Sequence, residues 1–68
     1  MSFFEWLGQQ VERRDHVGAF ARFAVADRVF PRQYNQLYFF LLRYEGMPAA
    51  RAGVKAAHRE WRRQRHAA

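Results

Sequence analysis

The 68-residue sequence contains no cysteine, and its only serine or threonine is Ser2. The missing cysteine excludes disulfides, thiolate metal ligands and cysteine nucleophiles. Ser2 is placed to cap a helix, so a serine-based catalytic site is not expected. The histidines, His16, His58 and His66, lack the four-residue spacing that puts two metal ligands on one helix face. These gaps predict a non-catalytic protein without a cofactor, a bound metal or a small-molecule substrate.

Long apolar runs are also missing. The longest is Leu37 to Leu42, far short of the ~20 residues that a spanning helix needs. The amino-terminal segment carries Glu5 where a secretory signal peptide would carry positive charge. We therefore expect an unprocessed cytoplasmic protein that does not span a membrane.

Positive charge is plentiful and is concentrated at one end. The chain has 12 basic and 6 acidic residues, a formal net charge of +6. Nearly all of this excess lies beyond residue 50, where Glu60 is the only acid. Almost all the basic residues are arginine, as expected from a GC-rich genome, but such a bias does not explain the excess itself. The basic residues of this last segment are Arg51, Lys55, Arg59, Arg62, Arg63 and Arg65.

Capping and breaking residues predict four helices. Ser2 and Glu5 have the spacing of a capping box, and Asp15 is a candidate N-cap. The Phe30-Pro31 pair breaks the helical pattern, with Phe30 expected in the core. Gly46 suits a helix end and Pro48 a first helical turn. The expected helices lie at about 3–13, 16–27, 33–45 and 48–63, with a frayed carboxyl terminus.

The apolar spacing predicts which faces are buried. In the third helix the inward face should hold Tyr34, Leu37, Tyr38, Leu41 and Leu42. In the fourth it should hold Ala50, Val54, Ala57 and Trp61, while the side chains at 51, 55, 59 and 62 stay in water beside a solvated His58. The fold class is therefore all-α: a compact single domain of four helices spanning residues 1–68.

Several segments resemble a known family. They are the opening Met-Ser-Phe-Phe-Glu-Trp-Leu, the segment Arg14-Asp15-His16-Val17-Gly18, and Asp27 followed by Phe30-Pro31. In this order and at these distances they resemble the YozE-like family of small bacterial and phage proteins, closely to residue 31 and loosely to Trp61. The resemblance implies a fold like the sterile alpha motif and no catalytic residue, in a family whose biochemical role is not established. Members look more acidic in the second and fourth helices than this chain.

Two binding functions remain open. The basic residues of the last segment could neutralise phosphates of nucleic acid, an interaction that is independent of sequence and weakens with salt. The same residues could contact an acidic protein, helped by Phe39, Phe40 and Trp6 if four short helices leave them exposed. We expect a binding module with nucleic acid slightly favoured; the oligomeric state is not indicated by the sequence.

Overall fold

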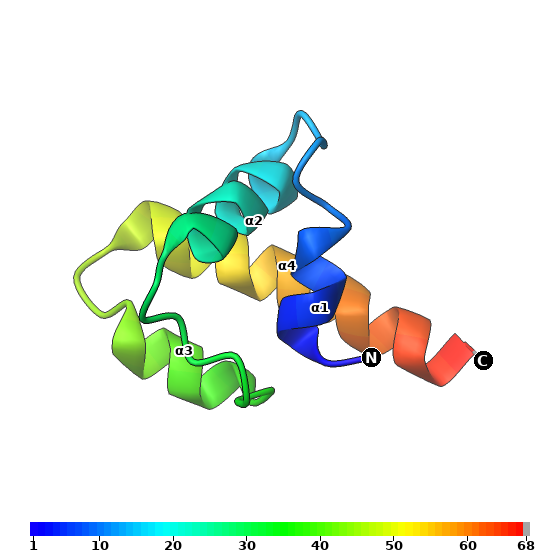
Figure 1. The fold of residues 1–68 in the computed structure, drawn as a ribbon. Coiled ribbons are helices and arrows are strands. Elements are labelled where there is room, and N and C mark those ends of the chain that lie inside the picture. Colours follow the sequence, from blue (N-terminus) through cyan, green and yellow to red (C-terminus); the bar gives the residue numbers. More distant parts are fainter. Residues whose placement is uncertain (68) are drawn as a thin grey trace.

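The computed structural model describes residues 1–67, with side chains up to residue 65. It contains α1 (Phe3–Gly8), α2 (His16–Ala26), α3 (Leu37–Arg43) and α4 (Pro48–Ala67), and no strand within that range. Figure 1 shows α4 as the long central element, with α2 crossing it, α1 against its later half and α3 along its earlier half. The all-α, four-helix prediction is confirmed. None of the described helices is long and apolar enough to cross a membrane.

The caps lie where the sequence places them. The Ser2 hydroxyl accepts a hydrogen bond from the Glu5 N–H at 3.1 Å, and the Glu5 carboxylate accepts one from the Ser2 N–H at 2.8 Å. The Asp15 carboxylate accepts a hydrogen bond from the Gly18 N–H at 3.0 Å. Each bond satisfies an amide that the first turn of a helix leaves without a partner. The second helix ends one residue before the expected position.

The first helix is shorter than predicted. It ends at Gly8 instead of residue 13, and the chain continues through tight turns such as Gln10 N–H to Leu7 C=O at 2.9 Å. Glycine is a weak helix former, which favours the end at this point. The turns bring Arg13 back beside α4, where it pairs with Glu60.

The third helix is also shorter, beginning at Leu37 instead of residue 33 and ending at Arg43. Asn35 explains the late start because its polar groups bond to other segments. Its side-chain oxygen accepts from the Phe3 N–H at 3.0 Å, and its carbonyl contacts His58 Nε2 at 2.7 Å. After the helix, Gly46 has a φ of +82°, which glycine adopts without strain.

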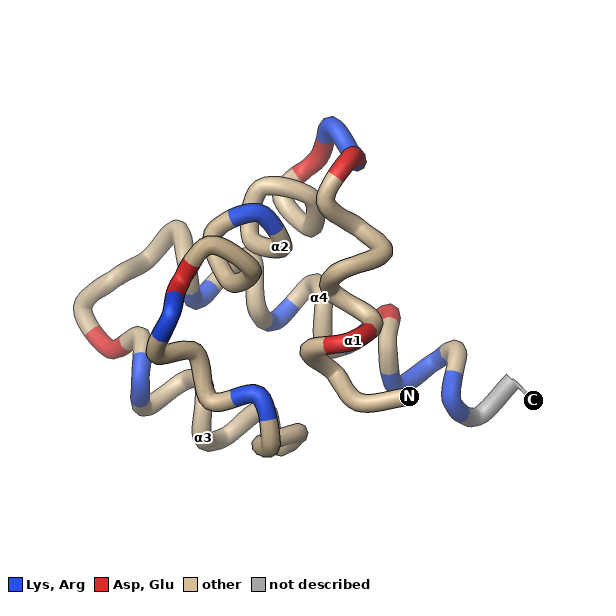
Figure 2. Tube along the Cα trace, viewed as in Figure 1, with Lys and Arg blue, Asp and Glu red and all other residues tan. Residues whose placement is uncertain are grey.

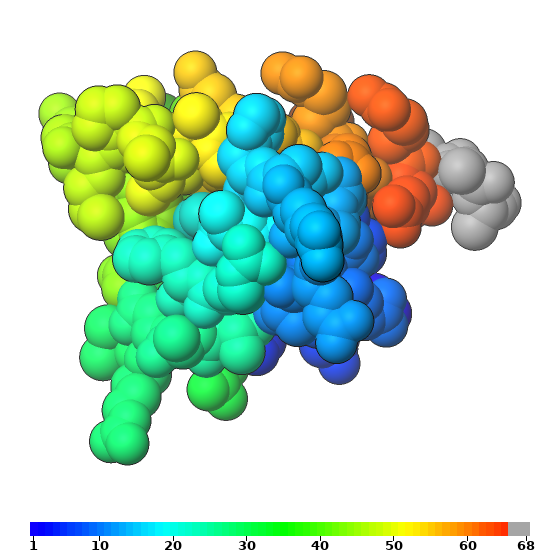
Figure 3. Space-filling view, turned by 90° about the horizontal axis from the view of Figure 1, so that it is seen from above, coloured from blue at the N-terminus to red at the C-terminus, as the bar shows by residue number. Residues whose placement is uncertain are grey.

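The fourth helix is longer than predicted: it continues past residue 63 to Ala67. The expected fraying therefore falls on a segment that is helical as far as it is described, and Ala68 lies outside the described residues. Figure 3 shows α2 and the segment after α1 packed along this helix. Gly53 allows the close crossing of α2, because a Cβ at this position would lie 2.8 Å from the Phe20 Cβ.

An aromatic cluster fills the core. The fully buried Phe3 ring lies within 5.5 Å, between ring centroids, of the Phe40, His58 and Trp61 rings. Phe40 in turn stacks on Phe30, with centroids 5.3 Å apart. Burying each phenylalanine contributes roughly 1.5–3 kcal/mol. The inward positions of Phe30 and Trp61 are as predicted.

The orientation of α3 differs from the prediction. Phe40 is its buried residue, followed by the buried C-cap Tyr44. Tyr34, Tyr38 and Leu42 are exposed, and Leu37 and Leu41 are only partly buried. The helix is apolar nearly all round, so the spacing did not determine which side faces the core. The aromatic surface predicted from Trp6, Phe39 and Phe40 is likewise wrong, since Trp6 and Phe40 are buried and Phe39 is half-buried.

Replacing Phe40 by alanine should lower the free energy of unfolding by about 3–5 kcal/mol, because it leaves a cavity at the centre of the core. That loss is a large share of the roughly 3–10 kcal/mol available to a chain of this length. Replacing the exposed Leu42 by alanine should change it by less than about 0.5 kcal/mol. Urea denaturation followed by circular dichroism measures both. Equal losses would contradict the described orientation of α3; if Phe40→Ala is unfolded, Phe40→Leu gives the comparison.

Candidate functional site

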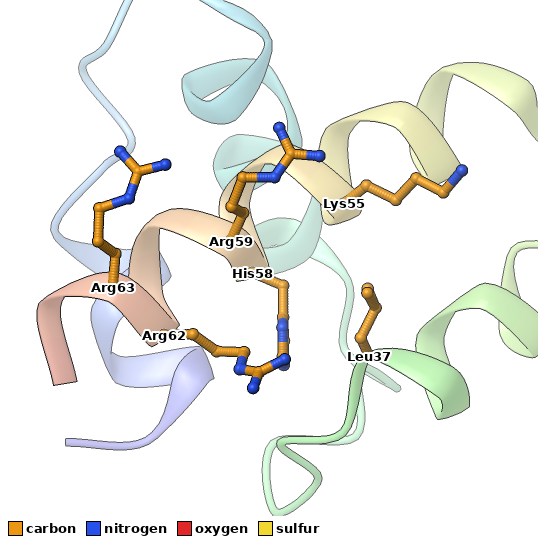
Figure 4. Close-up of a pocket in the computed structure, with 6 residues that line it drawn as sticks. All are labelled: Leu37, Lys55, His58, Arg59, Arg62 and Arg63. Atoms are coloured by element: carbon orange, nitrogen blue, oxygen red, sulfur yellow. The ribbon is translucent and has the colours of Figure 1, made fainter. Parts of the chain in front are cut away.

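A groove runs along the outward face of α4, and cationic side chains line it. The helix presents four cations on one side, because they are three or four residues apart or adjacent in the sequence. They are Lys55, Arg59, Arg62 and Arg63. Together with Leu37 and His58 they enclose a volume of about 490 Å³. Figure 4 shows Leu37 opposite α4 and Arg62 bending towards His58. We call this set of six residues the basic groove.

The charges of the basic groove are not neutralised within the part of the chain that the structure describes. All four of its cationic side chains are exposed. Among the described side chains, none accepts a hydrogen bond or forms an ion pair with them. Their guanidinium and ammonium groups are therefore free to contact an anionic partner.

Two cations outside the basic groove, Arg13 and Arg43, are paired with acids of the protein. Arg13 donates two hydrogen bonds of 3.0 Å to the Glu60 carboxylate and also bonds Asp15. These bonds raise the pKa of Arg13, with Glu60 the larger cause. Arg43 pairs with Asp27 at 3.6 Å. Figure 2 shows how basic and acidic residues are distributed along the trace. Glu60, the only acid of α4, is thus bonded away from the basic groove.

Two of the six predicted binding residues lie outside the basic groove. Arg51, expected in water, is half-buried and donates a hydrogen bond to the Leu41 carbonyl, so it ties α4 to the end of α3. Arg65 places its guanidinium carbon 4.7 Å from the centre of the Trp61 ring. The structure therefore brings four of the six together, while Arg51 bonds α3 and the exposed Arg65 lies over Trp61.

A second hollow of about 360 Å³ adjoins the basic groove and shares Leu37, His58 and Arg62 with it. We call it the tyrosine hollow. Tyr38 stands on its edge and is 73% exposed. No acidic residue lines either hollow. The tyrosine hollow is lined by Asn35, Gln36, Leu37, Tyr38, His58, Trp61, Arg62 and Arg65.

His58 forms the base of both hollows and is 4% exposed, so its predicted solvation is wrong. It lies four residues after the buried Val54 and three before Trp61, a spacing that could have indicated burial. Because the Asn35 carbonyl can only accept, Nε2 carries the proton and donates. Nδ1 is then unprotonated, and it is buried without a hydrogen-bond partner in the described residues. Burial, together with the nearby charges of Arg62 and Arg65, lowers the pKa of His58.

The lining of the basic groove suits the binding of an anion. Across the described residues, no group of three histidine or carboxylate side chains is placed to hold a metal ion. The basic groove contains cations, an apolar side chain and a neutral imidazole, which can attract and hold an anion.

Acid should destabilise the fold through His58. Its lowered pKa means that the unfolded chain binds a proton more readily than the folded one, so stability is constant well above pH 6.5 and falls as the pH drops below it. His58→Gln, whose amide can still donate a hydrogen bond, should lose this dependence. Urea denaturation at a series of pH values from neutral to mildly acidic measures it. His16→Gln, at an exposed site, is the control; if it flattens the profile as much as His58→Gln does, the assignment is wrong.

Comparison with known proteins identifies the family and the fold of the chain. The family model described as the YozE SAM-like fold matches residues 2–44. This match confirms the resemblance seen in the sequence and the fold that it implies. It includes α1, α2 and α3 and ends before α4, so the cationic residues of the basic groove lie beyond it. No curated protein and no solved structure matches the chain significantly.

Proposed function

We propose that this chain, which belongs to the YozE SAM-like family, is a non-catalytic module that binds nucleic acid through the basic groove. The supporting observation is that four exposed cations without a described partner lie together on one face of α4. Arg13, Arg43 and Arg51 are engaged within the protein, whereas the four cations of the basic groove are exposed without a described partner. Closely spaced phosphates would satisfy all four at once, and each contact would release counterions.

A cytoplasmic location is part of the same proposal. It is supported by the absence of cysteine, which suits a reducing compartment, and by the need for the module to meet nucleic acid. No small-molecule substrate or cofactor is required, because binding alone is proposed. The affinity should be independent of sequence, since the described contacts would be made to phosphates.

A second candidate is binding to an acidic protein. An apolar hollow of about 320 Å³ between α2 and the start of α4 favours it, because Phe23 and Met47 are partly exposed there. A protein partner could bury these side chains and pair its carboxylates with cations of α4. A partner captured after nuclease treatment, and lost from a Met47→Glu variant, would support this candidate. The hollow is lined by His16, Ala19, Phe20, Phe23, Met47, Ala49 and Ala50.

Fluorescence anisotropy with a labelled nucleic acid tests the first candidate. At physiological salt we expect a dissociation constant in the micromolar range or weaker. The logarithm of affinity for duplex should fall with the logarithm of salt at a slope of roughly −3 to −4 if all four cations contact phosphates. The double variant Arg59→Glu/Arg62→Glu should bind more than about tenfold more weakly at low salt, because two attractive contacts become repulsive.

The matched control is Arg14→Glu/Arg28→Glu, which has the same net charge and alters two exposed arginines outside the basic groove. It should retain most of the affinity, and circular dichroism should show the same helix content in both variants. If the control loses as much as the groove variant, net charge alone accounts for binding. If the wild type does not bind at low salt, the protein partner becomes the better candidate.

A further inference from the structure

We propose that the basic groove and the tyrosine hollow together bind a single strand of nucleic acid in preference to a duplex, with the Tyr38 ring stacking on a base. This inference rests on the proposed function, because it assumes that phosphates contact the cations of α4. It adds a preference for one form of nucleic acid and a residue that determines it.

The two hollows form a continuous path. They share Leu37, His58 and Arg62, so a ligand that occupies one extends into the other. From Lys55 to Arg65 the path follows about 15 Å of helix. One strand of nucleic acid has a phosphate about every 3.4 Å along a helical axis, so this length matches a few consecutive phosphates of a single backbone.

Tyr38 provides a surface for a base. Among the described aromatic rings none pairs with it, whereas the neighbouring Tyr34 is stacked on Phe39 with centroids 4.2 Å apart. Tyr38 follows Leu37 in the first turn of α3. It lines the tyrosine hollow together with Arg62 and Arg65. A largely exposed ring beside two cations is the combination that single-strand binding proteins use, with the cations on the backbone and the ring on a base.

Duplex nucleic acid cannot use this combination. Its bases are paired and stacked inside the helix, so their faces are not available to a ring on the protein surface. A duplex would contact only the cations of α4, and neither Tyr38 nor the exposed part of Leu37 would contact a base. A polyanion without bases, such as heparin, would do the same. The extra affinity from stacking is therefore specific to unpaired bases.

Anisotropy titrations with labelled oligothymidine and with a duplex of equal phosphate number, at the same low salt, test the preference. The wild type should bind the single strand more tightly. Tyr38→Ala should weaken single-strand binding by about 5- to 150-fold, the effect of removing one base–aromatic contact, and leave duplex binding unchanged. Tyr38→Phe keeps the ring and should bind like the wild type. Val29→Ala is the control, because Val29 is also 73% exposed but lines neither hollow.

The outcomes separate the two proposals. If neither nucleic acid binds the wild type, the proposed function fails. If both bind equally and Tyr38→Ala has no effect, or if the variant weakens both alike while remaining folded, the single-strand inference is overturned and the proposed function stands. Should Tyr38→Ala unfold, photocrosslinking of the wild type to an oligonucleotide containing 5-iodouracil decides: the crosslink should map to the peptide containing Tyr38, and a crosslink elsewhere contradicts the inference.

Discussion

The arrangement of the molecule depends on one asparagine. Asn35 accepts a hydrogen bond from the Phe3 N–H through its side chain and one from His58 through its carbonyl. It thereby joins the start of α1, the segment before α3 and the middle of α4, three parts far apart in the sequence. Each such bond contributes about 0.5–1.5 kcal/mol net, and leaving a buried partner unsatisfied costs more.

This connection also creates the candidate site. Leu37 and Tyr38 lie two and three residues after Asn35, so the bond from His58 fixes the start of α3 against α4. Without α3 on this side, the outward face of α4 would be a row of cations with no opposing wall. The neutral His58 fits this position, because burial and then the nearby charges of Arg62 and Arg65 disfavour a charged imidazole. The same residue thus closes the core and forms the base of the basic groove.

The sequence was sufficient to predict helices whose limits depend on local chemistry. Ser2, Asp15 and Pro48 act within one or two turns, and the structure places each at a helix boundary, whereas Gly46 lies two residues past the C-cap Tyr44 of α3. Helix ends that depend on contacts with residues far away in the sequence could not be predicted in this way. The late start of α3 depends on bonds from Asn35 to residues more than twenty positions away.

The candidate site was likewise predictable only where it depends on the sequence of one helix. Arg63 was predicted from its charge alone, whereas the regular spacing of cations in α4 indicated Lys55, Arg59 and Arg62, since that spacing is a property of one helix. The spacing did not distinguish Arg51 and Arg65, whose positions depend on Leu41 and Trp61. Tyr38 was assigned to the core because α3 is apolar on nearly every side. Its exposure follows only from the packing of Phe40 and Tyr44 against other helices.

The limits of the family match suggest how fold and binding are divided along the chain. Residues 2–44 include Asn35, Leu37 and Tyr38, one wall of the site, whereas the cations of the other wall lie beyond the match. Lys55, Arg59, Arg62 and Arg63 are exposed, while Val54, Ala57 and Trp61 on the same helix fill the core. Substitutions on the outward face can therefore change the charge of the site at little cost in stability. A chain with the same fold and an acidic α4 would keep the aromatic core and the hydrogen bonds of Asn35. Its groove would nevertheless repel the phosphates that we propose the basic groove binds.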